Sequence, residues 1–187
     1  MPQVFVITGP SGVGKGTLIR LLRERMPELE LAVSATTRRP RAGETQGEDY
    51  WFLTDEEFQR RADEGDFVEH AEYAGRRYGT LRSELERRIG AGHPVVLEIE
   101  VQGARQIRRT MPEAVQIFIA PPNAEVLRAR LVGRGTDEPD EVEARLRTAR
   151  AELAAQDEFG VVVVNDRLDE AVDRLEAIVR RALHSPA

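Results

Sequence analysis

The 187-residue sequence contains no cysteine and only one lysine, Lys15. Without cysteine the chain can form neither disulfides nor thiolate metal sites. It also lacks an apolar run of about 18 residues, the length that spans a bilayer, and its N-terminus has no signal-peptide pattern. The net charge of −6 argues against general nucleic-acid binding, which needs a basic excess. We therefore expect one compact cytoplasmic domain that binds neither membrane nor nucleic acid.

Lysine is replaced by arginine almost everywhere, since 26 of the 27 basic residues are arginine. Genome composition or a warm habitat can shift this ratio without any effect on function, and this explanation covers most positions. The lysine that persists lies in a glycine-rich segment, which makes its position informative. The three histidines are scattered along the chain, so structural or surface roles are favoured over a metal site.

The glycine-rich segment "GPSGVGK" fits the phosphate-binding pattern G-x-x-x-x-G-K. An apolar strand pattern at residues 4–7 precedes it, and a helical pattern with a broad apolar face starts at Thr17. Backbone N–H groups of such a loop converge on an anion, and the lysine reaches the outer phosphates. A fortuitous glycine turn is the alternative, but strand, spacing and helix together favour a site for the phosphates of a nucleoside triphosphate. Its candidate residues are Gly9, Pro10, Ser11, Gly12, Val13, Gly14, Lys15, Gly16 and Thr17.

One position departs from this pattern, which has Ser or Thr directly after the lysine to hold Mg²⁺. Gly16 follows here and Thr17 comes next, and a shift of one residue turns a helical side chain by about 100°. We therefore expect Mg²⁺ to be held mainly by nucleotide phosphates and water rather than by direct protein ligands. Thr17 and Glu98, which follows an apolar strand pattern, are candidates for water-mediated contact; a solvent-facing acid is the alternative for Glu98.

A second cluster, "SATTRRPRAGETQGEDYWF" at residues 34–52, concentrates arginines, hydroxyls and two aromatics in an otherwise acidic chain. Its proline and glycines predict an ordered loop rather than a helix or central strand. Forked guanidinium groups suit a second phosphate, and a solvated basic loop is the alternative.

Helical and apolar strand patterns alternate over the rest of the chain, which predicts an α/β fold with a mainly parallel sheet. Strand patterns occupy residues 29–34, 93–100, 114–120 and 160–164, and a hairpin pattern with its turn at Gly75 occupies 66–80. Helices are expected over 54–64, 80–92, 102–111, 121–135 and 142–153, and from Leu168 onward. The first of these starts with a capping box, Thr54 and Glu57.

The motifs and their order resemble the guanylate kinase family over roughly residues 4–182, including "GPSGVGKGT", "FVEHAEYAGRRYGT", "VVLEIEVQGARQIR" and "RLVGRGTDEPDEVEARL". The resemblance implies transfer of the γ-phosphoryl group of ATP to GMP with Mg²⁺, and leaves the use of dGMP open. It also implies a three-layer P-loop fold with a core of about 1–34, 82–130 and 146–187. A GMP-binding subdomain of about 35–81 and a mobile lid of about 131–145 would be inserted into that core.

The resemblance assigns roles to individual residues. Positions that match ligands of the GMP phosphate are Ser34, Arg38, Arg41, Tyr50 and Tyr78, whose donors suit a dianion. Positions that match the guanine-binding residues are Glu69, Thr80 and Glu100, the last where the family often has aspartate. Carboxylates complement the N1–H and N2 amine of guanine and disfavour adenine. Lys15, Arg38, Arg130, Arg134 and Arg145 match catalytic positions, and Asn165 is expected beside adenine.

Two rival functions predict different residues. A non-catalytic scaffold of guanylate-kinase type would lose the P-loop lysine or the lid arginines, and this chain retains Lys15, Arg134 and Arg145. A kinase that uses AMP, or a GTPase, would not be expected to have the paired acids Glu69 and Glu100, and no N-K-x-D guanine motif of GTPases is present. The sequence leaves the oligomeric state open.

Overall fold

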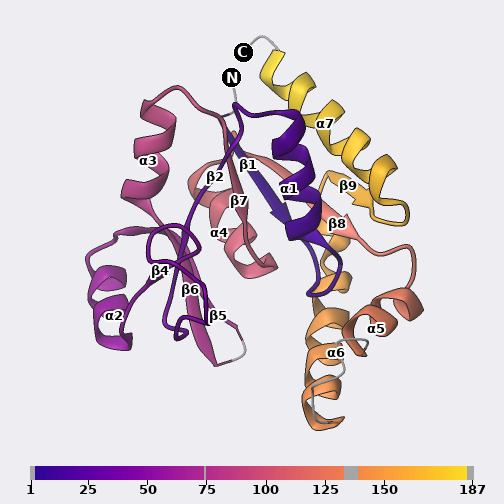
Figure 1. The fold of residues 1–187 in the computed structure, drawn as a ribbon, viewed down its shortest axis with the longest axis horizontal. Helices are drawn as coiled ribbons and strands as arrows, with labels where there is room; N and C mark the ends of the chain where they lie inside the picture. The colour runs from indigo at the N-terminus through magenta and orange to yellow at the C-terminus, as the bar shows by residue number, and fades with distance from the viewer. Residues whose placement is uncertain (1–2, 74, 133–138, 185–187) are drawn as a thin grey trace.

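A parallel five-stranded sheet forms the centre of the computed structural model, which describes residues 3–73, 75–132 and 139–184 (Figure 1). Its strand order is β2-β7-β1-β8-β9. The strands are β1 (Val4–Thr8), β2 (Glu30–Leu31), β7 (Val95–Glu98), β8 (Val115–Ala120) and β9 (Val161–Val164). Every neighbouring pair in this sheet is parallel, so the predicted α/β fold with a mainly parallel sheet is confirmed.

Strand β1 is apolar throughout because it contributes to two hydrophobic cores, one on each face of the sheet. Phe5 and Ile7 pack in the core under α1 (Lys15–Arg25) and α7 (Leu168–His184). Val4 and Val6 pack on the opposite face with α3 (Arg82–Gly90) and α4 (Val101–Thr110). Each such side chain stabilises the fold by about 1.5–3 kcal/mol relative to an exposed one. The two cores fix the carboxyl end of β1, where the glycine-rich loop begins.

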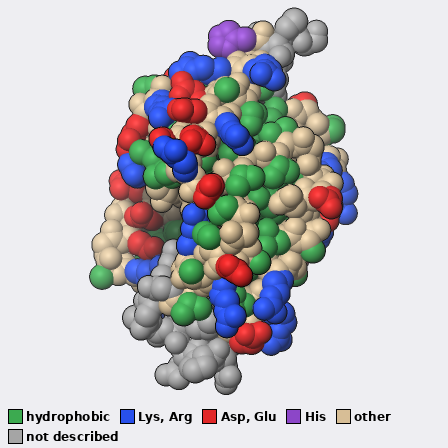
Figure 2. Space-filling view, turned by 90° about the vertical axis from the view of Figure 1, so that its right-hand side faces the viewer, with side chains coloured by type: hydrophobic (Ala, Val, Ile, Leu, Met, Phe, Trp, Pro, Cys, Tyr) green, Lys and Arg blue, Asp and Glu red, His purple; other side chains and the backbone are tan. Residues whose placement is uncertain are grey.

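Strand β9, which the pattern at residues 160–164 predicts, lies at one edge of the parallel sheet. Val163 is 1% exposed, whereas Val162 and Val164 are each 38% exposed, so one face of β9 packs in the core and the other is partly open to solvent. Figure 2 views the molecule from this edge and shows apolar side chains between charged ones. Helices α5 (Ala124–Val132) and α6 (Pro139–Ala154) and the short helix η1 (Gln156–Glu158) connect β8 to β9.

A second sheet, of order β4-β3-β6-β5, lies beside the parallel sheet at the lower left of Figure 1. It contains β3 (Ser34–Thr36), β4 (Trp51–Phe52), β5 (Phe67–Tyr73) and β6 (Arg76–Leu81). Helix α2 (Asp55–Asp63) covers it through Phe58, which packs with Ala35, Phe67 and Leu81 in a separate small core. The Thr54 hydroxyl accepts a hydrogen bond from the Glu57 backbone N–H at 3.1 Å, as half of the predicted capping box requires. None of the helices in the described ranges has the length and hydrophobicity of a membrane span.

Two local predictions are wrong. The pattern at residues 29–34 predicts one strand, but β2 belongs to the parallel sheet and Ser34 already starts β3 in the second sheet. Residues 34–52 are not a loop throughout, because both ends form strands of the second sheet. The chain leaves the parallel sheet at Val33, whose N–H is bound by the Glu84 carboxylate at 3.2 Å instead of by a strand. Such a side-chain acceptor far along the chain is invisible to local pattern analysis.

Glu84 anchors this departure point, and its removal should destabilise the protein. Its side chain is 3% exposed and also accepts hydrogen bonds from Arg87 and Arg88, and Arg88 in turn pairs with Glu30. We expect Glu84→Ala to lower the free energy of unfolding by about 3 kcal/mol, because it leaves the buried Val33 N–H without an acceptor and removes one of the two carboxylates that pair with Arg88. Chemical denaturation at neutral pH measures this loss.

The pH dependence of the stability lost in Glu84→Ala shows whether the Glu84 carboxylate charge is its cause. Burial raises the pKa of Glu84, but the hydrogen bonds from Arg87, Arg88 and Val33 outweigh it and hold the pKa below its usual value. The stabilisation is therefore present at neutral pH and is lost as pH falls through the lowered pKa. The difference in the free energy of unfolding between wild type and Glu84→Ala should therefore become smaller in acid. A difference that does not change with pH would contradict this explanation, and so would an equal loss of stability in the control Glu86→Ala.

Candidate functional site

The glycine-rich loop connects β1 to α1 in a conformation that depends on its glycines. Gly14, which caps α1, has φ 96°, in the left-handed region. At Gly9 a Cβ atom would lie 2.3 Å from the carbonyl oxygen of Ile119, so only glycine fits beside β8. Helix α1 starts at Lys15, two residues before the predicted start, which places Lys15, Gly16 and Thr17 in its first turn. Their backbone N–H groups lack intrahelical partners and are suited to bind an anion.

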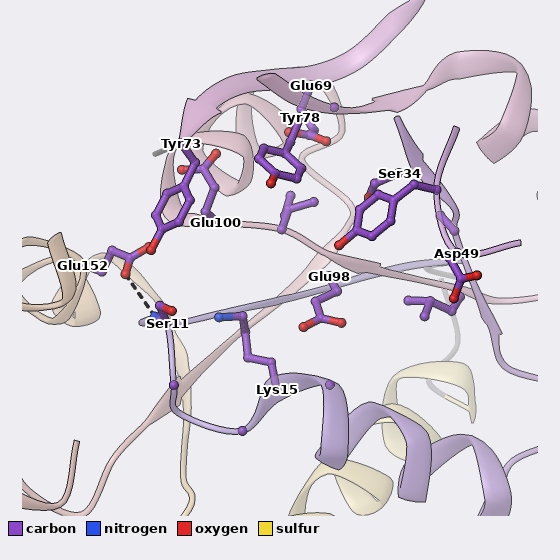
Figure 3. Close-up of a pocket in the computed structure, with 18 of the residues that line it drawn as sticks. Ser11, Lys15, Ser34, Asp49, Glu69, Tyr73, Tyr78, Glu98, Glu100 and Glu152 are labelled. Atoms are coloured by element: carbon purple, nitrogen blue, oxygen red, sulfur yellow. Dashed lines mark hydrogen bonds between the residues drawn. The ribbon is translucent and has the colours of Figure 1, made fainter. Parts of the chain in front are cut away.

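Lys15 extends from this first turn into a cleft (Figure 3). Its Nζ donates hydrogen bonds to the carbonyls of Gly9 at 2.6 Å and Pro10 at 3.2 Å, so the ammonium lies across the start of the loop. Burial lowers the pKa of Lys15, and the charges of Glu98, Glu152 and Glu100 oppose this shift. The lysine is thus a positive group among carboxylates, positioned by the loop it belongs to.

The cleft has a volume of about 640 Å³ and separates the glycine-rich loop from the second sheet. It brings together many of the residues that the sequence singles out. From the predicted ATP site it is lined by Ser11, Gly12, Gly14, Lys15, Gly16 and Thr17. From the predicted GMP site it is lined by Ser34, Tyr50, Glu69, Tyr78 and Glu100. The two sets therefore face each other across one space.

Glu69 and Thr80 form a buried polar pair at the second-sheet side of the cleft. They lie opposite each other on β5 and β6, and the Thr80 hydroxyl donates a hydrogen bond to Glu69 Oε1 at 2.7 Å. Only 4% of Glu69 and 1% of Thr80 are exposed. Burial raises the pKa of Glu69 to about 7, with a further increase from Glu100 and a partial decrease from Thr80. A group of this kind can exchange a proton near neutral pH when a ligand binds.

Glu100 has a structural partner that the sequence analysis does not anticipate. It is the N-cap of α4, and its two carboxylate oxygens accept hydrogen bonds from the backbone N–H groups of Gln102 at 3.1 Å and Gly103 at 3.0 Å. Burial raises the pKa of Glu100, and these two N–H groups lower it. Since a carboxylate has about four acceptor positions, capping leaves room for a contact with a ligand in the cleft.

Arg38 and Arg41 do not line the cleft in this structure. The terminal nitrogens of Arg38 bind both carboxylate oxygens of Glu44, at 2.9 and 2.7 Å, and its guanidinium lies 5.1 Å from the centre of the Tyr50 ring. The Arg41 backbone N–H donates to Glu44 at 2.7 Å. The Arg38 hydrogen bonds, followed by that of Arg41, lower the pKa of Glu44 to about 2. Glu44 is thus a partner of the arginines that the sequence analysis missed.

Glu98 lies close to the first turn of α1, as expected for an acid at the end of β7. Its carboxylate oxygens are 3.7 and 3.8 Å from where a Cβ of Gly16 would stand. Burial raises the pKa of Glu98, and the Lys15 charge opposes this. Within the described ranges no three histidine, aspartate or glutamate side chains cluster as a ready metal site. Glu98 and Thr17 both line the cleft.

Arg130 and Asn165 support the glycine-rich loop from outside the cleft lining. Arg130 donates to the carbonyls of Val13 at 3.4 Å and Asn165 at 3.2 Å, and the Asn165 side-chain amide donates to Val13 at 2.8 Å. Arg134 lies outside the described residues. Arg145 belongs to α6, but its side chain is also outside the described part of the chain.

Glu152 on α6 is a cleft residue that the sequence analysis missed. Its carboxylate accepts a hydrogen bond from the Ser11 backbone N–H at 3.2 Å, and Figure 3 shows it close to Tyr73. Only 8% of Glu152 is exposed; burial raises its pKa and the Lys15 charge opposes this. The sequence does contain one sign of its burial: Glu152 lies three residues after Ala149, which places an acid beside the apolar side of α6.

A glycine-rich loop between a buried parallel strand and a helix, with its lysine in a cleft, defines a P-loop nucleotide-binding protein. Comparison with known proteins narrows this class. The chain belongs to the guanylate kinase family, whose model matches residues 1–182.

The family assignment agrees with several relatives. A guanylate kinase of Parasynechococcus marenigrum is 53% identical over 96% of this chain and 98% of its own length. One of Synechocystis is 55% identical over 95% of this chain and 93% of its own. The crystal structure of guanylate kinase from Anaplasma phagocytophilum superposes with a TM-score of 0.78 at 34% identity, covering 97% of this chain and 86% of that one.

Proposed function

We propose that this enzyme transfers the γ-phosphoryl group of ATP to GMP across the cleft between the P-loop and the second sheet. A phosphate oxygen of GMP attacks the γ-phosphorus, the bond to the β-phosphate bridging oxygen breaks, and ADP and GDP leave. The observation that carries the proposal is that Lys15 and the buried Glu69, whose carboxylate accepts a hydrogen bond from Thr80, line the same cleft from opposite sides. The attacking oxygen is already anionic, so positioning and charge neutralisation suffice and no strong base is needed.

The GMP side of this proposal assigns two groups of residues. The phosphate would be bound by Ser34, Arg38, Arg41, Tyr50 and Tyr78, and guanine by Glu69, Thr80 and Glu100. The phosphate would compete with Glu44 for the Arg38 guanidinium, because both are anions that a bidentate fork binds. The Glu69 carboxylate would accept hydrogen bonds from N1–H and the N2 amine of guanine, whereas adenine presents a lone pair at N1.

On the ATP side, the P-loop N–H groups would bind the phosphates and Asn165 would lie near adenine. Lys15 would follow the γ-phosphoryl group, with Arg130, Arg134 and Arg145 as further positive groups. The domain division predicted from the sequence is part of this proposal: a GMP-binding subdomain of about 35–81 and a lid of about 131–145 that exclude water when closed. A cytoplasmic location stays a prediction from the sequence.

Magnesium is the cofactor that we propose with ATP. Glu98 offers a hard oxygen donor beside the first turn of α1, and Gly16 leaves the space next to it open. Thr17 and Glu98, which both line the cleft, would hold the ion through water molecules. When bound, Mg²⁺ neutralises charge on the β- and γ-phosphates.

A coupled assay of ADP release tests the proposed function, with ATP and a panel of GMP, dGMP, AMP, CMP and UMP. We expect kcat/KM for GMP to exceed that for AMP by at least about 10³-fold, because a base-binding site with buried polar groups discriminates strongly. Comparable rates with AMP would support the rival kinase, and ADP release without any acceptor would indicate a simple nucleoside triphosphatase.

A further inference from the structure

Gly103, in the first turn of α4, is packed directly against the Glu69 carboxylate. A Cβ atom at this position would lie 2.4 Å from Glu69 Oε2 and 3.1 Å from its Cδ. Real Cβ atoms do not approach other atoms this closely, so any side chain at position 103 must displace the carboxylate. The backbone of Gly103 is helical, with no positive φ that would itself require glycine.

The carboxylate has little freedom to move away. On its other side Oε1 accepts the 2.7 Å hydrogen bond from Thr80, and only 4% of Glu69 is exposed. Helix α4 cannot easily retreat either, because the Gln106 side-chain amide binds both the N–H and the carbonyl of His70, at 3.1 and 2.7 Å. Gln106 lies three residues after Gly103 and thus on the same face of the helix. Glu69 is therefore held between β6 and α4.

We infer that Gly103 is a specificity-determining positioning residue: the missing side chain allows the Glu69 carboxylate to lie against α4, where it can meet the base of GMP. This inference rests on the proposed function of Glu69 as a guanine-binding acid. Helix propensity offers no other reason for glycine here, since alanine is about 1 kcal/mol more favourable inside a helix. Gly103 itself acts through Glu69 and contacts no reacting atom.

A double-mutant cycle with Glu69 tests the inference. Gly103→Ala should lower kcat/KM for GMP at least tenfold while the KM for ATP stays close to wild type. Aspartate is one methylene shorter than glutamate, so the added methyl group fits better beside it. In the Glu69→Asp background, Gly103→Ala should therefore cost less than threefold.

Gly90 provides the matched control, because it is also helical and a Cβ there would meet nothing within 4 Å. Gly90→Ala should leave kcat/KM for GMP unchanged. The inference is overturned if Gly103→Ala stays within twofold of wild type, or if its loss is equally large in both backgrounds.

A measurement on the free enzyme separates this inference from the proposed function. NMR titration of the Glu69 carboxyl, with ¹³C-labelled glutamate, should give a different pKa in Gly103→Ala but the wild-type pKa in Gly90→Ala. One possible result is that the pKa shift appears but Glu69→Gln leaves the preference for GMP over AMP unchanged. Gly103 then packs against Glu69 as described, but Glu69 does not bind guanine, and the specificity role of Gly103 is wrong. If the preference depends on Glu69 but no shift or coupling appears, only the role of Gly103 is wrong.

Discussion

Lys15→Arg should fold normally and lose about 10²-fold or more in kcat, which corresponds to about 3 kcal/mol of transition-state stabilisation. The Lys15 ammonium fits against the carbonyls of Gly9 and Pro10, at 2.6 and 3.2 Å, inside a loop that cannot widen on the Gly9 side because Ile119 is in contact. A guanidinium is a wider planar group and would have to displace this loop. A compact ammonium on a flexible stem can follow the transferred phosphoryl group.

Steady-state kinetics with both substrates varied measure this effect. The loss should appear in kcat rather than in the KM for GMP, because the lysine acts on the transferred group. Arg20→Lys is the matched control on the same helix: Arg20 is exposed and pairs with Glu24, so this exchange should change neither constant. If Lys15→Arg retains activity within a few-fold of wild type, the lone lysine is an accident of composition.

Glu69→Gln should raise the KM for GMP about 10²-fold and reduce the preference for GMP over AMP. The amide can still accept the hydrogen bond from Thr80, but its NH₂ group would face donors of guanine, and two charge-assisted hydrogen bonds would be lost. Competition between GMP and AMP in the ADP-release assay measures the change. Glu72→Gln, on the exposed side of the same strand, should behave as wild type.

The same residue should give GMP binding a pH dependence. The pKa of Glu69 is raised to about 7, so the carboxyl must lose its proton before it can accept both hydrogen bonds from guanine. Affinity for GMP should thus be full above pH 7 and decline as pH falls through this value. Glu69→Gln is the control, because the second ionisation of the GMP phosphate near pH 6 affects wild type and this variant equally. If Glu69→Gln shows the same decline around pH 7 as wild type, Glu69 is not its cause.

Prediction from the sequence succeeds for the P-loop because all of its parts are contiguous. Strand, glycine loop, lysine and helix follow one another within residues 4–25, and local backbone preferences with the hydrophobic pattern specify each of them. The alternation of apolar strands with helices likewise predicts the parallel sheet. Errors occur where residues distant along the chain determine the local structure. The strand predicted at 29–34 is interrupted, because the Val33 N–H donates a hydrogen bond to the Glu84 carboxylate instead of to a neighbouring strand.

The sequence by itself determined which chemistry this protein can perform, through residue types at fixed spacing. Tertiary structure alone decided which side chains share the cleft, because their partners are distant along the chain. Glu152 reaches Ser11 across 141 positions, and no local pattern contains that contact. Burial also depends on packing: the sequence predicts Glu69 as a guanine-binding acid but not its burial, and only the close approach of α4, β5 and β6 removes water from it and raises its pKa. Gly103 is likewise an ordinary helix glycine until that carboxylate is placed against it.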